Sequence, residues 1–248
     1  RLGILGAGMM GAGVAYVSAR AGMDVVLLDS TPELAAKGKD YSRQLLAKDV
    51  SRGKRSQADA DAVLARIKTT SSYEDLAGAD LVIEAVFESR EIKADVTQKT
   101  EAVIPKNAVF ASNTSTLPIT GLAQASKRPT QFIGIHFFSP VDKMPLVEVI
   151  VGKKTAPEAI ARSLDYIQQI GKTPIVVNDS RGFFTSRVFS TYTSEGIRML
   201  AEGINPALIE NAAIMAGLPV GPLTVTDEVT IELAWKIGKA TAEALGKT

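Results

Sequence analysis

Short apolar runs alternate with segments of helical periodicity in the first part of the chain. Residues 2–5 and 24–28 are apolar runs of strand length, bounded by glycine or polar residues, which predicts two strands. The segment between them, 9–21, has small and apolar residues at helical spacing and predicts a helix. Strand, helix and strand in this order form a βαβ unit, so we expect the two strands to be parallel.

The same pattern predicts a larger sheet and a helical end. Between the second strand and the later ones, a charged segment at 32–68 predicts two amphipathic helices joined at 51–55. After residue 179 the strand pattern stops, and 183–201 and 206–216 have helical periodicity. The later apolar runs of strand length lie at 81–86, 108–111, 131–138, 146–151 and 174–177.

These elements predict the α/β class. We expect a Rossmann-type, doubly wound, mostly parallel sheet in a domain at 1–178, with a helical arm at about 32–68 as an insertion. A smaller all-α domain is expected at 179–248. Because residue 1 already lies in a predicted strand, we expect the sequence to be a piece of a longer chain and the second domain to be truncated.

Composition narrows the possible functions. The chain has 248 residues, of which 46% are hydrophobic, so it can bury a large core. Lys and Arg number 28 against 27 Asp and Glu, and this balance leaves no overall basic field for nucleic acid or anionic lipid. The chain has no cysteine and one histidine, which excludes disulfides, thiol catalysis, thiolate metal sites and His-rich metal sites. We therefore expect no metal ion.

The sequence also bears on location. It contains no recognisable signal peptide and no apolar run of about 18 residues, so we expect no membrane insertion. A reducing compartment is compatible with the lack of cysteine. We expect a bacterial cytoplasmic protein, while a mitochondrial or peroxisomal location stays open.

A glycine-rich loop follows the first predicted strand. Gly6-Ala7-Gly8-Met9-Met10-Gly11 matches the pattern GxGxxG at the start of a predicted helix. Gly6 permits the tight turn, Gly8 lets a pyrophosphate approach backbone N–H groups, and Gly11 allows close packing of helix on strand. The next strand ends at Asp29, whose carboxylate can bind the ribose hydroxyls of NAD and would repel the 2′-phosphate of NADP. The loop therefore predicts an NAD site.

Two plainer interpretations of this loop stay open. A lone GxGxxG also marks ordinary turns, although strand, helix, second strand and terminal acid together favour a nucleotide site. Asp29, taken singly, is also typical of a solvated acid at the end of a strand.

The single histidine is the candidate acid or base. His136 lies near the end of the predicted strand 131–138, and ligands bind at strand ends in α/β sheets. Oxidation of an alcohol by NAD requires removal of the hydroxyl proton, and imidazole exchanges protons near neutral pH. Glu148 is an acid inside an apolar strand, where an unpaired charge is costly, and it could orient the imidazole. A structural core histidine and an outward-facing glutamate are the alternatives.

The motifs together resemble those of a known family. The chain is similar to the L-3-hydroxyacyl-CoA dehydrogenases of fatty-acid β-oxidation over nearly its whole length. It is most similar to the dehydrogenase part of the multifunctional α-subunits, in which an enoyl-CoA hydratase precedes the dehydrogenase. The similarity rests on the glycine loop and on the segments Val86-Phe87-Glu88, Ser112-Asn113-Thr114-Ser115, His136-Phe137-Phe138-Ser139-Pro140 with Glu148, Gly182-Phe183-Phe184 and Gly217-Leu218-Pro219-Val220-Gly221-Pro222.

The resemblance implies a reaction and the residues that perform it. His136 would be the general base toward the 3-hydroxyl group, and Glu148 its orienting partner, while hydride passes to the nicotinamide of NAD. Ser115 would hydrogen-bond the substrate oxygen. Asn113 would position the substrate or the nicotinamide.

Other positions depend more heavily on the resemblance. Glu88 and Lys93 fall at family positions near the cofactor ribose; by pattern alone they are typical of a helix-start acid and an exposed lysine. Ser139 and Ser186 stand where many family members have asparagine. Ser186 replaces a catalytic asparagine, and its shorter side chain can still form a hydrogen bond, directly or through a water.

The arm carries candidate contacts to the substrate. In this family the helical arm lies near coenzyme A, so the basic residues of its tip could meet the phosphates of that moiety. A solvated helix face is the alternative. The basic residues are Lys48, Arg52, Lys54 and Arg55, of which Lys48 and Lys54 are the predicted contacts.

The resemblance also implies partners. Apolar positions near the end of the chain, Ile231, Leu233 and Trp235, would pack against the first domain and a second helical unit in this family. If that unit is missing, a second copy could cover them. We expect an acyl-CoA substrate and a homodimer, or a place in a complex with hydratase and thiolase activities.

Two other functions stay open. A β-hydroxyacid dehydrogenase shares the Rossmann domain and the helical tail, but it acts on free acids and uses a lysine as its acid or base. A non-catalytic NAD-binding module would keep the fold, although His136 and Glu148 argue against it. The favoured prediction is an NAD-dependent 3-hydroxyacyl-CoA dehydrogenase of undefined acyl chain length.

Overall fold

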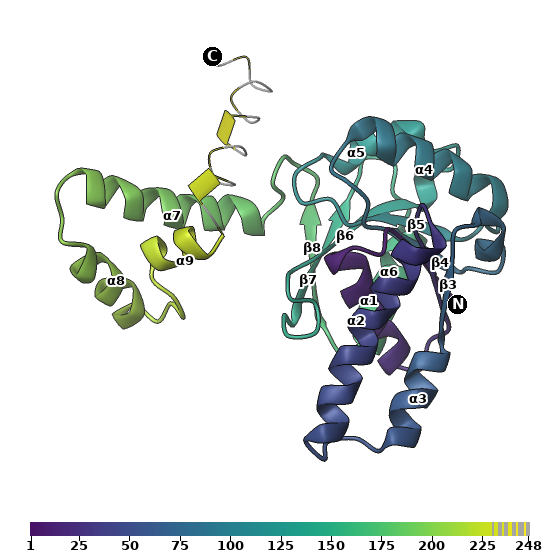
Figure 1. The fold of residues 1–248 in the computed structure, drawn as a ribbon. Helices are drawn as coiled ribbons and strands as arrows, with labels where there is room; N and C mark the ends of the chain where they lie inside the picture. The colour runs from purple at the N-terminus through teal and green to yellow at the C-terminus, as the bar shows by residue number, and fades with distance from the viewer. Residues whose placement is uncertain (230, 233–234, 236–237, 240–241, 243–245, 247–248) are drawn as a thin grey trace. The chain divides into compact units, whose positions relative to one another are not determined.

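A computed structural model describes residues 1–229, 231–232, 235, 238–239, 242 and 246. The chain divides into two compact units, Arg1–Phe184 and Thr185–Thr248, which are described separately (Figure 1). Within the part of the chain that the structure describes, no helix has the length and apolar character needed to cross a membrane.

The first unit is built on one sheet, which has eight strands in the described residues, in the order β3-β2-β1-β4-β5-β6-β7-β8. Neighbours from β3 to β6 are parallel, β6 and β7 are antiparallel, and β7 and β8 are parallel again. The predicted mostly parallel sheet is therefore confirmed. The strands are β1 (Leu2–Leu5), β2 (Val25–Leu28), β3 (Ile67–Thr70), β4 (Leu81–Glu84), β5 (Val109–Ser112), β6 (Phe132–Phe137), β7 (Leu146–Val151) and β8 (Thr173–Asn178).

Helices cover both faces of this sheet, as doubly wound folds require. One apolar cluster joins the sheet to α1 and α6, through Val14 and Ile167 among others, and a second joins it to α4 and α5, through Val96 and Leu122. The helices are α1 (Met9–Arg20), α2 (Pro32–Ser51), α3 (Gln57–Ala65), α4 (Arg90–Val103), α5 (Ile119–Leu122) and α6 (Pro157–Gln169). Short 3₁₀ turns lie at Tyr73–Leu76, Ala123–Ala125 and Pro129–Gln131.

The structure differs from the sequence prediction at several elements. Strand β3 was not predicted, and it includes residues 67–68, which were predicted as part of the arm. Ile67 is the only buried residue of this strand, so no apolar run in the sequence indicates a strand there. Helices α4 and α6 were also not predicted. The predicted strand 81–86 ends at Glu84, because the backbone of Ala85 lies directly against Gly6.

The centre of the sheet contains a stacked aromatic pair that supports stability. Phe110 and Phe132 are buried, with ring centroids 5.4 Å apart. Replacing Phe110 with alanine is expected to lower the free energy of unfolding by about 3–5 kcal/mol, because a cavity would remain where the ring was. Denaturant unfolding measures this loss. Phe87→Ala is the control, since Phe87 is 83% exposed, and an equal loss in both variants would contradict the expectation.

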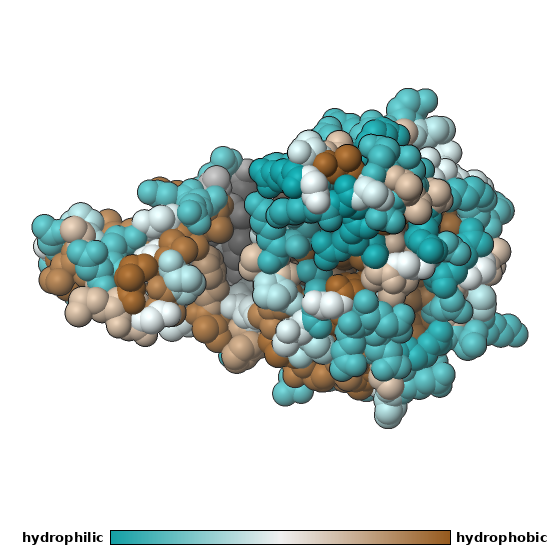
Figure 2. Space-filling model, turned by 90° about the horizontal axis from the view of Figure 1, so that it is seen from below, coloured by the Kyte–Doolittle hydropathy of each residue, from teal (hydrophilic) through white to brown (hydrophobic). Residues whose placement is uncertain are grey.

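The second unit is helical, as predicted, with α7 (Thr185–Ala201), α8 (Pro206–Met215) and α9 (Pro222–Glu228). The helix predicted from residue 183 begins at Thr185, because Phe183 is buried in a core cluster of the first unit. Apolar side chains are exposed on the face of this unit that Figure 2 shows. The exposed apolar residues of the unit include Phe189, Leu208, Ile231 and Trp235. Leu233 lies outside the described residues. The predicted homodimer stays a prediction.

Candidate active site

The pairing of β6 with β7 brings the predicted acid and base together. His136 and Glu148 are direct partners in this antiparallel pair, so their side chains leave the same face of the sheet. His136 Nδ1 and Glu148 Oε2 are 2.8 Å apart. Both residues are buried, with Glu148 fully enclosed. The spacing of twelve residues in the sequence thus becomes a contact through a hairpin that the two strands form.

This contact determines where the imidazole can accept a proton. An ionised carboxylate only accepts hydrogen bonds, so Nδ1 carries a hydrogen and donates it to Glu148. The lone pair therefore lies on Nε2, which is 3.1 Å from the hydroxyl oxygen of Ser115. Ser115 is exposed while His136 is buried, so the basic nitrogen faces the open side of the site. This arrangement can take a proton from an alcohol.

The wall around His136 is aromatic, and the sequence did not reveal how it is built. The His136 ring lies 4.6 Å from the ring of Phe138 and 5.9 Å from that of Phe183. Phe183 has a left-handed φ of 48°, directly after Gly182 at 73°. This turn directs the backbone N–H of Phe184 to Glu148 Oε1, at 3.1 Å. A main-chain donor leaves no signal in the residue types, so only the folded structure identifies it.

Asn113, at the end of β5, braces the strand that carries His136. Its side-chain oxygen accepts a hydrogen bond from the backbone N–H of Phe137 at 2.8 Å. Asn113 itself is 9% exposed. The side-chain carbonyl of Asn113 is thus already hydrogen-bonded within the protein. Its predicted contact with substrate or nicotinamide stays a prediction.

Lys93 is buried beneath the site. Its ammonium lies 2.9 Å from both carboxylate oxygens of Glu84 and 3.4 Å from Glu88 Oε2. Burial raises the pKa of Glu84, and this exceeds the opposite effect of Lys93 and of the Ser112 hydroxyl. Glu84 was not predicted as a site residue, although it is an acid inside the predicted apolar strand 81–86, the same signal that identified Glu148.

Glu88 lies at the surface of this cluster and holds a loop beside the histidine. Its Oε1 accepts hydrogen bonds from the Thr114 hydroxyl at 2.5 Å and from the backbone N–H groups of Ser115 and Thr116, each at 3.2 Å. Desolvation raises the pKa of Glu88, but the Thr114 hydroxyl and the Lys93 ammonium lower it by more, so the pKa lies below its ordinary value. Glu88 is therefore an ionised acceptor at neutral pH.

The glycine loop has the shape that a dinucleotide needs. A Cβ on Gly11 would collide with the carbonyl oxygen of Gly6, and one on Gly6 would lie 2.7 Å from the carbonyl oxygen of Ala85. A Cβ on Gly8 would meet nothing within 4 Å among the described residues. Packing explains two of the glycines, whereas Gly8 keeps open the space before the first turn of α1, formed by Met9, Met10 and Gly11. Such space fits a pyrophosphate at a helix N-terminus.

Asp29 closes the other side of this loop. One carboxylate oxygen accepts the backbone N–H of Ala7 at 2.6 Å, and the other accepts that of Ser30 at 2.7 Å. The side chain thus lies at the end of β2 next to the glycine turn, where an NAD ribose is expected. The residues present fit the cofactor.

The remaining predicted residues lie elsewhere. Lys48 and Lys54 are exposed near the tip of the arm formed by α2 and α3 (Figure 1). Helix α2 has 20 residues, so it is about 30 Å long. Ser186 lies in the first turn of α7, in the second unit. Within the first unit the structure therefore groups Ser115, His136 and Glu148, and it does not group Lys48 and Lys54 with them.

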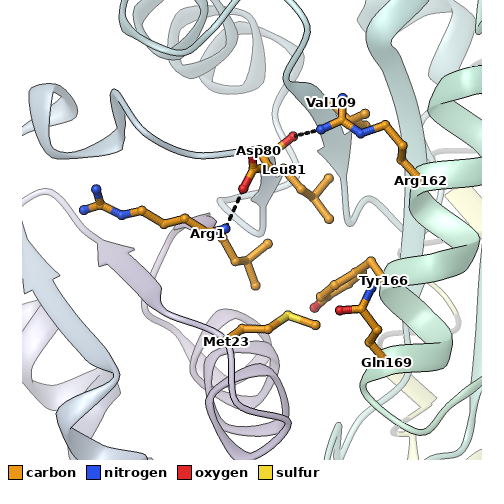
Figure 3. A pocket seen from close by; sticks show the side chains of 9 residues that line it. Arg1, Met23, Asp80, Leu81, Val109, Arg162, Tyr166 and Gln169 are labelled. Carbon is orange, nitrogen blue, oxygen red and sulfur yellow. Dashed lines mark hydrogen bonds and ion pairs between the residues drawn. The ribbon is translucent and has the colours of Figure 1, made fainter.

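A separate hollow lies at the opposite end of the strands (Figure 3). Leu81 and Val109, which begin β4 and β5, line it, whereas ligands of α/β sheets bind at the carboxyl ends. Its charged groups are paired with one another or with the backbone: the amino group of Arg1 lies 2.6 Å from Asp80, and Arg162 donates to backbone carbonyl oxygens. This hollow is not the candidate active site.

The fold and the site together define a Rossmann-type dehydrogenase, in which a glycine loop for NAD lies on the same sheet as a His–Glu pair. The family model described as 3-hydroxyacyl-CoA dehydrogenase, NAD binding domain, matches residues 1–180, and the corresponding C-terminal domain model matches 182–248. The chain belongs to the 3-hydroxyacyl-CoA dehydrogenase family. The predictions of this family and of NAD as cofactor are confirmed.

Individual relatives agree with this membership. The fatty acid oxidation complex subunit alpha of Shewanella amazonensis is 40% identical over 245 residues, which cover 98% of this chain and 35% of that protein. The chain thus spans about a third of the length of such curated relatives.

Solved structures of the family are also similar. The (S)-3-hydroxybutyryl-CoA dehydrogenase of Ralstonia eutropha has a TM-score of 0.94 at 34% identity, covering 99% of this chain and 87% of that one. The 3-hydroxybutyryl-CoA dehydrogenase of Escherichia coli K12 has a TM-score of 0.93 at 34% identity, covering 100% and 53%.

Proposed function

We propose that the chain oxidises the 3-hydroxyl group of an L-3-hydroxyacyl-CoA to the 3-ketoacyl-CoA in fatty-acid β-oxidation, with reduction of NAD⁺ to NADH and release of a proton. The observation that carries this proposal is the Ser115–His136–Glu148 contact chain on the sheet that also bears the glycine loop. The relatives named above are 3-hydroxybutyryl-CoA dehydrogenases and a fatty acid oxidation complex subunit.

His136 is the general base in this proposal. Its Nε2 takes the proton of the substrate hydroxyl, and Ser115 hydrogen-bonds the same oxygen. Glu148 stabilises the resulting imidazolium through Nδ1 and keeps the ring in its productive orientation. The aromatic wall and the burial of Glu148 exclude water from this pair, so the attraction between the charges is stronger than it would be in solvent. When bound, NAD⁺ supplies the hydride acceptor.

Other side chains would bind or position the reactants. Asp29 and the glycine loop would hold NAD, with Glu88 and Lys93 near the cofactor ribose. Asn113 would hold the substrate or nicotinamide, and Ser186 would assist as a hydrogen-bonding group. Lys48 and Lys54 would reach the phosphates of coenzyme A, for which a solvated helix face remains the alternative.

The partners are part of the same proposal. The curated relatives are named as subunits of a fatty acid oxidation complex, so we propose that the whole protein works with hydratase and thiolase activities, or as a homodimer. The exposed apolar side chains of the second unit offer such a contact. Gel filtration of the full-length protein, alone and with these activities, tests the assembly.

The test of the reaction is an acetoacetyl-CoA-dependent NADH oxidation assay, with loss of NADH absorbance as the readout. We expect turnover with the thioester and none with free acetoacetate. Turnover of the free acid alone would favour a β-hydroxyacid dehydrogenase. Tight NADH binding without turnover at any acyl length would favour a non-catalytic NAD-binding module.

A further inference from the structure

Glu84 is a buried acid that the proposed reaction does not use directly. It ends β4, and its side chain is 1% exposed. Its carboxylate accepts hydrogen bonds from the Lys93 ammonium, from the Ser112 hydroxyl and from the backbone N–H of Val86. Its backbone carbonyl accepts the N–H of Asn113 at 2.9 Å. Glu84 thus joins the ends of two neighbouring strands to helix α4.

From Glu84 a continuous series of contacts leads to the catalytic histidine. Lys93 joins Glu84 to Glu88, with its ammonium 2.9 and 3.4 Å from their oxygens. Glu88 accepts the backbone N–H of Ser115 at 3.2 Å. The Ser115 hydroxyl in turn lies 3.1 Å from His136 Nε2.

A second series of contacts ties Glu84 to the same loop. The Ser112 hydroxyl donates to Glu84 and accepts the backbone N–H of Thr114 at 3.3 Å. Glu84 therefore holds the Ser112–Thr116 segment by two routes. One runs through the Ser112 hydroxyl, and the other runs through Lys93 and Glu88.

We propose that Glu84 is a positioning residue, which holds the Ser115 hydroxyl against His136 by way of Lys93 and Glu88. This inference rests on the proposed function, because it assigns Ser115 to the reacting oxygen. Stability alone does not account for the ion pair: two well-packed apolar side chains are often as stable as a buried pair. A positioning role does account for it: the Lys93 ammonium contacts the carboxylates of both Glu84 and Glu88, and these charge-assisted contacts fix where the Glu88 side chain can lie.

The test is a double-mutant cycle between Glu84→Gln and Ser115→Ala, read as kcat for acetoacetyl-CoA-dependent NADH oxidation. Ser115→Ala is expected to lower kcat by about 10²-fold, through loss of a hydrogen bond to the reacting oxygen. Glu84→Gln is expected to lower kcat by about 10- to 100-fold, because small misplacements of a catalytic group have effects of this size. The double variant should be no slower than Ser115→Ala alone.

The cycle separates positioning from a purely structural role. If Glu84 only stabilises the fold, Glu84→Gln lowers the melting temperature and leaves kcat of the folded protein unchanged. If it acts on the reaction by another route, its effect on kcat multiplies with that of Ser115→Ala. Either result overturns the inference. Full kcat in Ser115→Ala, or an inactive unsubstituted chain, would overturn the proposed function and this inference with it.

Two further variants keep the test conclusive. Glu84→Gln leaves the Lys93 ammonium short of a buried partner and can fail to fold. In that event the combined substitution Glu84→Gln with Lys93→Gln replaces Glu84→Gln, both in the unsubstituted chain and together with Ser115→Ala, and the same result is expected. It removes the Lys93 ammonium that holds Glu88 and leaves no unpaired buried cation. Asp95→Asn is the matched control: it removes the exposed 2.7 Å ion pair with Lys99 on the same helix and should leave kcat unchanged.

Discussion

Replacing His136 with glutamine is expected to lower kcat for acetoacetyl-CoA-dependent NADH oxidation by about 10²- to 10⁴-fold, the contribution typical of a general acid or base. This assay runs in the direction of ketone reduction, in which the His136 imidazolium donates a proton to the substrate oxygen. In alcohol oxidation the neutral imidazole removes that proton. Glutamine can still hydrogen-bond Glu148, but its amide does not exchange a proton at neutral pH. Steady-state kinetics at saturating NADH and acetoacetyl-CoA measure the loss.

Binding and folding should be nearly unaffected by the same change. The glycine loop and Asp29 follow β1 and β2, not β6, and the side-chain contacts of His136 are to Glu148 and Ser115. NADH titrated by fluorescence should therefore bind His136→Gln about as tightly as the unsubstituted chain. Tyr166→Phe is the control for loss of a buried polar group, because the Tyr166 hydroxyl contacts only the Ser18 hydroxyl, at 2.8 Å, among the contacts of the described residues. Its kcat should not change. Turnover retained in His136→Gln would contradict the assignment of the base.

Replacing Gly8 with valine is expected to weaken NADH binding by about 100-fold or more. The added side chain would occupy the space that Gly8 leaves open before α1, and hydrogen bonds from backbone N–H groups to the pyrophosphate would be lost at about 1.5–3 kcal/mol each. The folded state should tolerate the change, because a Cβ at Gly8 meets no described atom within 4 Å. Fluorescence titration with NADH gives the dissociation constant.

Gly238→Val is the matched control for this experiment. A Cβ at Gly238 also meets nothing within 4 Å in the described part of the chain, and the glycine lies in the second unit. The two substitutions therefore add the same side chain at positions where a Cβ meets no described atom, and only Gly8 belongs to the glycine loop. Equal NADH affinity in Gly8→Val and Gly238→Val would show that the loop does not bind the cofactor phosphates.

Local patterns predicted the glycine loop and the strand and helix on either side of it. The loop from Gly6 to Gly11 lies between an apolar strand and a helix, and every residue of that unit is close in the sequence. Apolar periodicity and the placement of glycines are therefore enough to predict this unit. An apolar run likewise predicts β7, whose predicted bounds agree with the structure. Strand β3 escaped prediction for the same reason, since its burial depends on its neighbour β2 and not on its own residues.

The sequence by itself determined the type of sheet, the glycine loop and the identity of the candidate acid and base, because each follows from residue types within elements and from the order of those elements. Only the tertiary structure decided that His136 and Glu148 are direct partners, that the N–H of Phe184 holds Glu148, and that Lys93 is buried between Glu84 and Glu88. Those contacts depend on strand register and on main-chain donors. Register is set by packing of whole elements, and a main-chain N–H is the same in every residue except proline, so neither can be read from residue types.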